Sequence, residues 1–196
     1  MAGDGTPAPV EGEPANLTAR RRLGVFCLVA GGVLGLDIVT KVLAVSHLEG
    51  REPLRVLGGL AYLQVIRNPG AAFSMASGLT VVFALFAVVV VVALGWIAPK
   101  VRSALWAVAL GLALAGASGN LVDRLFRAPG PLRGHVVDFV SLLRPDAGFF
   151  PIFNVADAAI SCGAALVVLL TLLGRSYDGT VVRSGWRRSD PTAIDP

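Results

Sequence analysis

Long apolar stretches alternate with polar segments along the whole chain. Four of them have about the 20 apolar residues that a helix needs to cross a bilayer: 23–45, 78–98, 103–122 and 149–174. The connections 46–77 and 123–148 are long, and 99–102 is very short. This pattern predicts an all-α membrane protein with four transmembrane helices, in which both long connections lie on the same side.

The first long connection has a different, β-type pattern. Residues 54–57 and 60–66 are rich in Leu, Val, Ile and Tyr, and Gly58-Gly59 separates them. Two such runs around a glycine pair predict a small β-hairpin or sheet between the first and second helices. Pro69-Gly70 is a turn signal that returns the chain to the membrane.

Composition supports a membrane protein. Hydrophobic residues make up 55% of the chain and charged residues 15%, whereas about 25% of a soluble domain is charged. The mean hydropathy is +0.71 and the isoelectric point about 9.7. Because the basic residues flank apolar spans, their expected partners are membrane lipids. No basic-aromatic surface is visible that would stack bases, so we expect no nucleic-acid partner.

The ends of the chain differ from its centre. Residues 1–18 and 176–196 are rich in Gly, Pro and polar residues and are predicted to be disordered tails. Residues 19–175 form the predicted four-helix domain. Basic residues are concentrated in the short flanks on the side of the tails: Arg20, Arg21, Arg22, Lys100, Arg102 and Arg175. This bias predicts cytoplasmic termini, with both long connections outside.

Two acids indicate possible chemistry. Asp138 follows an apolar Val136-Val137 run, and Asp157 lies near the start of the fourth span, three residues after Asn154. Helix capping alone would account for Asn154 and Asp157. If the two acids share a site, however, their repulsion keeps one ionised and the other protonated near neutral pH. An aspartic hydrolase needs this protonation state. The segment 139–153 leaves their proximity open.

Other polar residues lie at the ends of the spans. Asp37 and Lys41 have i,i+4 spacing and form either a helix ion pair or a group that positions a loop or substrate. Asp123 follows a span and opposes the helix dipole, so it needs a cationic partner, either Lys41 or Arg124. The amide of Asn120 is able to donate to a neighbouring carboxylate.

Other functional classes are less favoured but stay open. His47 and His135 lie in connections, and no metal-ligand cluster, phosphate loop or Gly-x-Ser-x-Gly elbow is visible. A proton-coupled transporter would place acids near the middle of spans and often shows an internal repeat. A non-catalytic scaffold or lipid-binding protein would not depend on the acids. The residues themselves favour a hydrolase, with the transporter as the main alternative.

Five motifs occur in order over about residues 23–174. They are Asp37-Ile38-Val39-Thr40-Lys41, Asn68-Pro69-Gly70-Ala71-Ala72-Phe73-Ser74, Gly119-Asn120-Leu121-Val122-Asp123-Arg124, Val136-Val137-Asp138-Phe139 and Phe153-Asn154-Val155-Ala156-Asp157. Together they resemble the bacterial lipoprotein signal peptidases (signal peptidase II, aspartic peptidase family A8). None of the five motifs departs from the family pattern.

The resemblance implies an intramembrane aspartic endopeptidase of the bacterial cytoplasmic (inner) membrane. Such an enzyme removes the signal peptide of a diacylglyceryl-modified prolipoprotein, cutting before the lipidated cysteine. It implies a β-cradle outside the membrane, an active site near the extracytoplasmic face, sensitivity to globomycin-type peptides, a monomer, and no metal or other cofactor. The implied catalytic pair is Asp138 and Asp157. The implied supporting or substrate-binding residues are Asn120, Arg124, Asn154, Asn68, Asp123, Asp37, Lys41 and Gly119.

Overall fold

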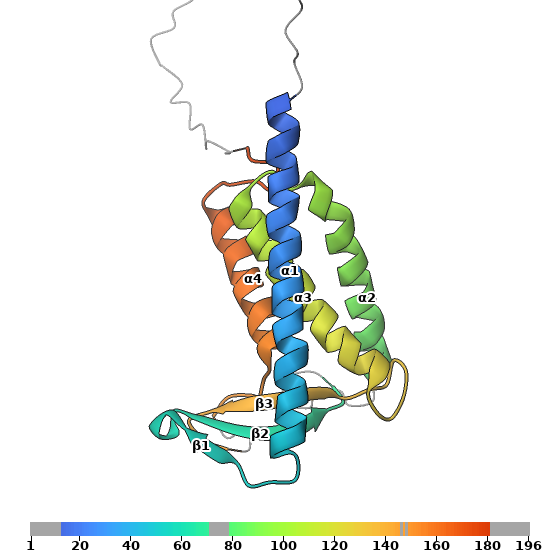
Figure 1. Ribbon diagram of the computed structural model, residues 1–196, viewed down its shortest axis with the longest axis vertical. Helices are drawn as coiled ribbons and strands as arrows, with labels where there is room; N and C mark the ends of the chain where they lie inside the picture. The colour runs from blue at the N-terminus through green and yellow to red at the C-terminus, as the bar shows by residue number, and fades with distance from the viewer. Residues whose placement is uncertain (1–12, 71–78, 146, 148, 181–196) are drawn as a thin grey trace, which may run out of the picture.

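The computed structural model describes residues 13–70, 79–145, 147 and 149–180 as four long helices and one small sheet (Figure 1). In chain order the elements are α1 (Glu13–Leu48), β1 (Leu54–Val56), the 3-10 turn η1 (Leu57–Gly59), β2 (Ala61–Asn68), α2 (Thr80–Ile97), the 3-10 turn η4 (Ala98–Lys100), α3 (Ala104–Phe126), β3 (Val136–Leu142) and α4 (Val155–Leu172).

The four predicted membrane spans are confirmed. Within the described residues, four helices are long and apolar enough to cross a membrane. Their outward faces carry apolar side chains, such as Val89 and Val92 of α2, which are 65% and 66% exposed. Apolar residues that cover the outside of a bundle are expected where lipid is the solvent.

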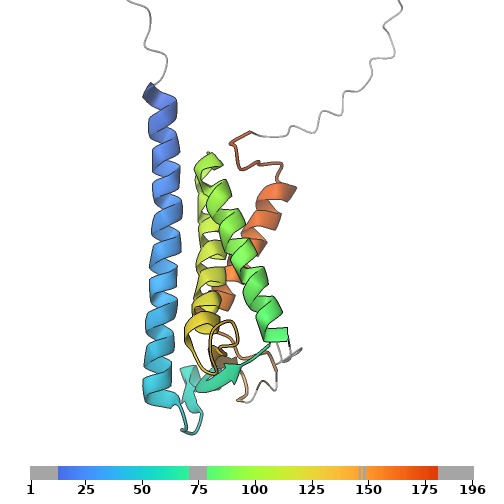
Figure 2. The ribbon, with the colours of Figure 1, turned by 90° about the vertical axis from the view of Figure 1, so that its right-hand side faces the viewer.

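Helix α3 is the centre of the bundle. It packs against α1, α2 and α4, and Figure 2 shows α1 on one side of α3 with α2 and α4 on the other. Glycines allow close approach at these contacts. A Cβ on Gly163 of α4 would lie 2.8 Å from the carbonyl oxygen of Ala109, and one on Gly116 would collide with Ala156 and Ile160. Small residues at helix interfaces are typical of membrane bundles.

The sheet is antiparallel, with strand order β1-β2-β3. The predicted hairpin is present as β1 and β2, and Gly58 adopts a φ of 68° in the turn, which suits glycine. The third strand, β3, was not predicted. It pairs with β2 from Ala61↔Leu142 to Asn68↔Val136, so it joins parts of the chain about 70 to 80 residues apart. Its Val-Val-Asp-Phe-Val-Ser-Leu sequence is rich in strand-forming residues.

The sheet lies at one end of the bundle, and the described chain ends lie at the other (Figure 1). Val137 and Phe139 of β3 pack with Ala44 near the end of α1. Both long connections are therefore on the sheet side, as the four-span pattern predicts.

The element boundaries differ from the prediction in three places. Helix α1 begins at Glu13, so residues 13–18 are helical rather than part of the tail. Helix α4 begins at Val155, later than the apolar stretch does. Residues 176–180 pack back on the bundle, where the Tyr177 carbonyl accepts the Arg102 N–H at 2.8 Å. The other tail residues, 1–12 and 181–196, lie outside the described residues.

Candidate active site

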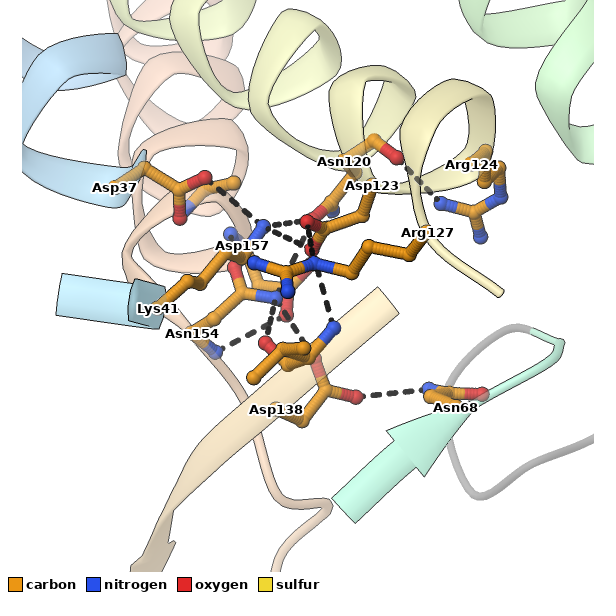
Figure 3. Close-up of polar contacts among 12 residues, drawn as sticks. Asp37, Lys41, Asn68, Asn120, Asp123, Arg124, Arg127, Asp138, Asn154 and Asp157 are labelled. Carbon is orange, nitrogen blue, oxygen red and sulfur yellow. Dashed lines mark hydrogen bonds and ion pairs between the residues drawn. The ribbon is translucent and has the colours of Figure 1, made fainter. Parts of the chain in front are cut away.

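All ten residues singled out from the sequence lie together at the sheet end of the bundle (Figure 3 and the contacts below). They come from five elements. Asp37 and Lys41 are on α1, Asn68 on β2, Gly119, Asn120, Asp123 and Arg124 on α3, Asp138 on β3, and Asn154 and Asp157 at the start of α4.

A backbone turn brings Asp138 and Asp157 together. After β3 the chain folds back, and Phe153 pairs with Val140, exchanging N–H···O bonds of 2.9 and 3.0 Å. This pairing sets Asn154 beside β3. The Asn154 Nδ2 donates to Asp138 Oδ1 at 2.7 Å, and its Oδ1 accepts the Asp157 N–H at 2.9 Å. The Asn154 side chain therefore connects the Asp138 carboxylate with the backbone of Asp157.

The predicted cap of α4 is confirmed. Asn154 is the N-cap, and Asp157 closes a capping box by accepting the Asn154 N–H at 3.2 Å. Capping accounts for only one carboxylate oxygen of Asp157, because the other oxygen accepts from Asn120 Nδ2 at 2.8 Å. Asp157 is half-buried and lines a cavity. It therefore faces both the helix start and open space.

Asp138 lies in a more enclosed position and is only 3% exposed. Its second oxygen accepts from Asn68 Nδ2 at 2.9 Å. Burial, reinforced by the charge of Asp157, raises the pKa of Asp138 from 3.8 to about 7, while the hydrogen bonds from Asn68 and Asn154 oppose that rise. Asp138 is therefore able to hold a proton near neutral pH.

A buried ion network lies behind Asn120. Lys41 is 1% exposed, and its Nζ contacts Asp37 Oδ2 at 2.9 Å and Asp123 Oδ2 at 3.0 Å. The predicted i,i+4 pair is thus present, and of the two predicted partners of Asp123 it is Lys41, not Arg124, that contacts it. Lys41 also donates to Asn120 Oδ1 at 3.1 Å. Because a lysine only donates, this contact directs the amide nitrogen of Asn120 toward Asp157.

Asp123 connects the end of α3 to β3. Its Oδ2 accepts the backbone N–H of Val137 at 3.1 Å, one residue before Asp138, and its Oδ1 pairs with Arg127. Arg127 was not predicted, although i,i+4 spacing on a helix is the signal that would have found it. The contacts of Asp123 go to Lys41, Arg127 and the backbone of Val137 rather than to the two acids, so they position the strand.

Arg124 points away from the ion network (Figure 3). It donates to the carbonyl oxygens of Asn120 at 3.2 Å and Gly70 at 3.0 Å. Arg124 is 8% exposed and lines the same cavity as the two acids. It therefore places a positive charge beside them and holds the start of the segment that follows β2.

Asp37 and Gly119 allow three helices to converge. Asp37 Oδ1 accepts the backbone N–H of Ala156 at 2.9 Å, which fixes the first turn of α4 against α1. A Cβ on Gly119 would collide with the Asp37 carboxylate and lie 3.2 Å from the Ala156 Cβ. Only glycine leaves room for that carboxylate between α3 and α4.

The cavity beside the acids has a volume of about 440 Å³ and mostly apolar walls. Sequence reasoning did not find these walls, because their residues come from an irregular segment and from the outward face of α4. They include Phe150, Pro151, Ile152, Ile160, Ser161 and Cys162. In the described part of the chain, no group of His, Cys, Asp or Glu is arranged to hold a metal ion.

The fold and the site define a polytopic membrane protein with paired carboxylates beside an apolar cavity. Residues 29–173 match peptidase family A8, described as signal peptidase (SPase) II, and the chain belongs to this family. It is 52% identical to a lipoprotein signal peptidase of Rhodococcus jostii (strain RHA1), over 85% of this chain and 81% of that protein. It is 49% identical to one of Mycobacterium avium (strain 104), over 89% and 90% of the two chains.

Solved structures agree with this assignment. Two structures of bacterial membrane enzymes superpose on the chain with TM-scores of 0.65 and 0.64, at 31% and 30% identity. The match covers 76% of this chain in both cases, and 88% and 93% of the two solved chains. Family membership supports lipoprotein signal peptidase activity.

Proposed function

We propose that the chain is an intramembrane aspartic endopeptidase with Asp138 and Asp157 as its catalytic pair. It removes the signal peptide of diacylglyceryl-modified prolipoproteins and cuts before the lipidated cysteine. One observation carries this proposal: Asn154 hydrogen-bonds both acids at the wall of an apolar cavity, and one acid has a pKa of about 7.

In this mechanism Asp138 holds the proton that the pair shares, and Asp157 acts as the base. Asp157 takes a proton from water, whose oxygen attacks the scissile carbonyl carbon, while Asp138 gives its proton to the carbonyl oxygen. Collapse of the resulting diol returns that proton to Asp138, and Asp157 protonates the leaving nitrogen as the C–N bond breaks. Each acid ends in its initial state, so no metal or cofactor is required.

The supporting residues act by holding this geometry. Asn120 and Asn154 direct amide donors at the two carboxylates, and Asn68 donates to Asp138. Arg124 lines the cavity, where a guanidinium is suited to bind a substrate carbonyl oxygen. Lys41, Asp37, Asp123 and Gly119 keep α1, α3, β3 and α4 in register around the pair. Hydrogen-bond donors that are already in place before the reaction lower the reorganisation energy of the reaction.

The cellular arrangement is part of the same proposal. The protein lies in the bacterial cytoplasmic (inner) membrane as a monomer, with 19–175 as the peptidase domain. Residues 1–18 and 176–196 lie on the cytoplasmic side as its tails, although α1 already begins at Glu13 and 176–180 contact the bundle. The site is then at the extracytoplasmic face. The α2–α3 connection, which carries Lys100 and Arg102, and the segment after α4, which carries Arg175, lie at the opposite end of the bundle (Figure 1), in agreement with the positive-inside rule. The substrate enters from the bilayer, so its acyl chains stay in lipid.

The proposal is tested by cleavage of a diacylglyceryl-modified prolipoprotein in detergent with chelator present. Wild-type, Asp138→Asn and Asp157→Asn proteins are compared with Asp178→Asn, which removes an exposed acid outside the site. Cleavage before the lipidated cysteine is expected for wild type and Asp178→Asn and is lost in the other two. Cleavage that survives Asp138→Asn or Asp157→Asn removes the pair from the mechanism. An inactive wild type would direct attention to proton-flux assays and the transporter alternative.

A further inference from the structure

The turn of the β1–β2 hairpin carries exposed leucines that the peptidase chemistry does not use. We call Leu54, Leu57, Leu60 and Leu143 the hairpin tip. Leu57 and Leu60 are 76% and 63% exposed, and the Leu143 N–H donates to the Leu60 carbonyl at 3.0 Å. This bond joins the end of β3 to the turn, and the Leu60 N–H donates to the Leu57 carbonyl at 3.2 Å, so Leu57, Leu60 and Leu143 lie together as an apolar patch. Such a patch on a sheet usually marks an interaction surface.

Two leucines of the hairpin tip have an unfavourable backbone conformation. Leu57 and Leu143 have φ angles of 51° and 60°, in the left-handed region that favours glycine and asparagine. A polar or glycine residue would relieve this strain and also suit a water-facing turn. Strained residues kept at an exposed turn point to a role for their side chains.

The level of the sheet along the bundle indicates what the tip meets. The lipid-facing surface of α1 is apolar through Val42 and Leu43 and becomes polar at Ser46 and His47. The sheet packs on α1 between Ala44 and Leu48, at the transition between these two zones. It therefore lies where the hydrocarbon core ends. Figure 1 shows the hairpin turn extending sideways beyond the helices, so at this level the tip faces the surroundings of the protein.

We propose that the hairpin tip inserts its leucines into the boundary between headgroups and acyl chains on the sheet side of the bilayer. Exposed basic side chains lie next to the leucines. Arg55 donates to the Gly58 carbonyl at 2.7 Å, and Arg144 follows Leu143 directly. Both arginine side chains are exposed. Arginines beside an apolar patch suit lipid phosphates above buried acyl chains, a charge match that favours lipid over a second protein.

Insertion of the tip would fix the tilt of the sheet relative to the bilayer. Strand β2 runs from the tip to Asn68, which donates to Asp138. The anchor is thus mechanically connected to the acid pair. It does not depend on peptidase activity, because it concerns the placement of the hairpin alone.

The test measures depth directly in the full-length protein. In a Cys27→Ala, Cys162→Ala background, Leu57→Cys and Leu60→Cys are labelled with a nitroxide and reconstituted in vesicles of phosphatidylglycerol and phosphatidylethanolamine. Electron paramagnetic resonance power saturation compares collisions with oxygen, which concentrates in lipid, and with a water-soluble nickel chelate. Val92→Cys on the outward face of α2 gives the lipid reference, and Asp178→Cys gives the water reference.

Both tip labels are expected to collide more with oxygen than the Asp178 label does and less than the Val92 label does, as suits a position at the boundary. Tip labels that match the Asp178 label would place the hairpin in water and overturn the proposal. Spectral broadening at the tip that disappears on dilution with unlabelled protein would show a second copy there, which overturns it as well. Leu60 repeats the measurement at a position with ordinary backbone geometry. A loss of prolipoprotein cleavage would leave this result unaffected.

Discussion

The hydrogen bond from Asn68 to Asp138 predicts how the pH profile of cleavage responds to mutation. Asp138 has a pKa of about 7 because it is buried beside Asp157, and the Asn68 amide stabilises its ionised form. The proposed mechanism needs Asp138 protonated, so activity falls as pH rises through about 7. In Asn68→Ala the ionised form loses a donor, and the pKa of Asp138 rises further.

The size of the shift follows from the strength of that bond. The Nδ2···Oδ2 distance is 2.9 Å, and Asp138 is 3% exposed, so water screens the contact little. A hydrogen bond to a charged group contributes about 1.5–3 kcal/mol. Since 1.36 kcal/mol corresponds to one pKa unit, the alkaline limb of the profile is expected to move up by roughly 1–2 units.

The assay is kcat/KM for a fluorescent lipopeptide across the alkaline limb, for wild type, Asn68→Ala and Tyr62→Phe. Tyr62 is on the same strand but lies opposite Ser141 rather than Asp138, so its variant serves as the matched control. A lower maximum kcat/KM in Asn68→Ala, with the alkaline limb shifted to higher pH, supports the reasoning. A limb that stays in place or moves downward in Asn68→Ala would show that Asp138 is not the group whose deprotonation ends activity.

Three further variants test the rest of the site. Lys41→Met leaves Asp37 and Asp123 buried without their shared cation and should lower the free energy of unfolding by about 3–5 kcal/mol. Its control, Arg67→Gln, breaks an exposed pair with Glu49 and should lower the free energy of unfolding by less than about 1 kcal/mol. Equal effects of the two variants in denaturation assays would contradict the assigned burial of Lys41. Gly119→Ala should destabilise by about 1–3 kcal/mol through overpacking, and Gly95→Ala, with nothing near its Cβ, should not. Asp123→Asn should leave residual cleavage where Asp138→Asn leaves none, and complete loss in a folded Asp123→Asn protein would refute that ranking.

The sequence predicted the features that depend on local patterns. Apolar runs of span length became α1 to α4, the i,i+4 spacing of Asp37 and Lys41 became an ion pair, and the Asn154-x-x-Asp157 pattern became a capping box. Each of these needs only neighbours within about one helical turn or one continuous stretch. Propensity and periodicity are therefore sufficient to find them.

The features that escaped prediction join distant parts of the chain. Strand β3 needs β2 as its partner, and the Phe153–Val140 bridge needs the intervening segment to fold back. Neither partner is specified by local sequence. The spacing of Asp138 and Asp157 left their proximity open for this reason. The cavity walls have no pattern of their own, since lipid-facing and cavity-facing apolar residues look alike in a sequence.

The position of the polar cluster explains why the protein buries charged side chains at one end of an apolar bundle. Peptide hydrolysis needs water, whereas a pair of acids with separated titrations needs burial. Both conditions are met only near a membrane boundary, where β3 supplies Asp138 from outside the spans and α4 begins with Asp157. Lys41 binds the Oδ1 atom of Asn120 on the side away from the cavity, and the cavity itself leaves the two acids accessible to substrate. A transporter would need its acids along a path through the bundle, and the contacts that join these two acids lie at one end of it.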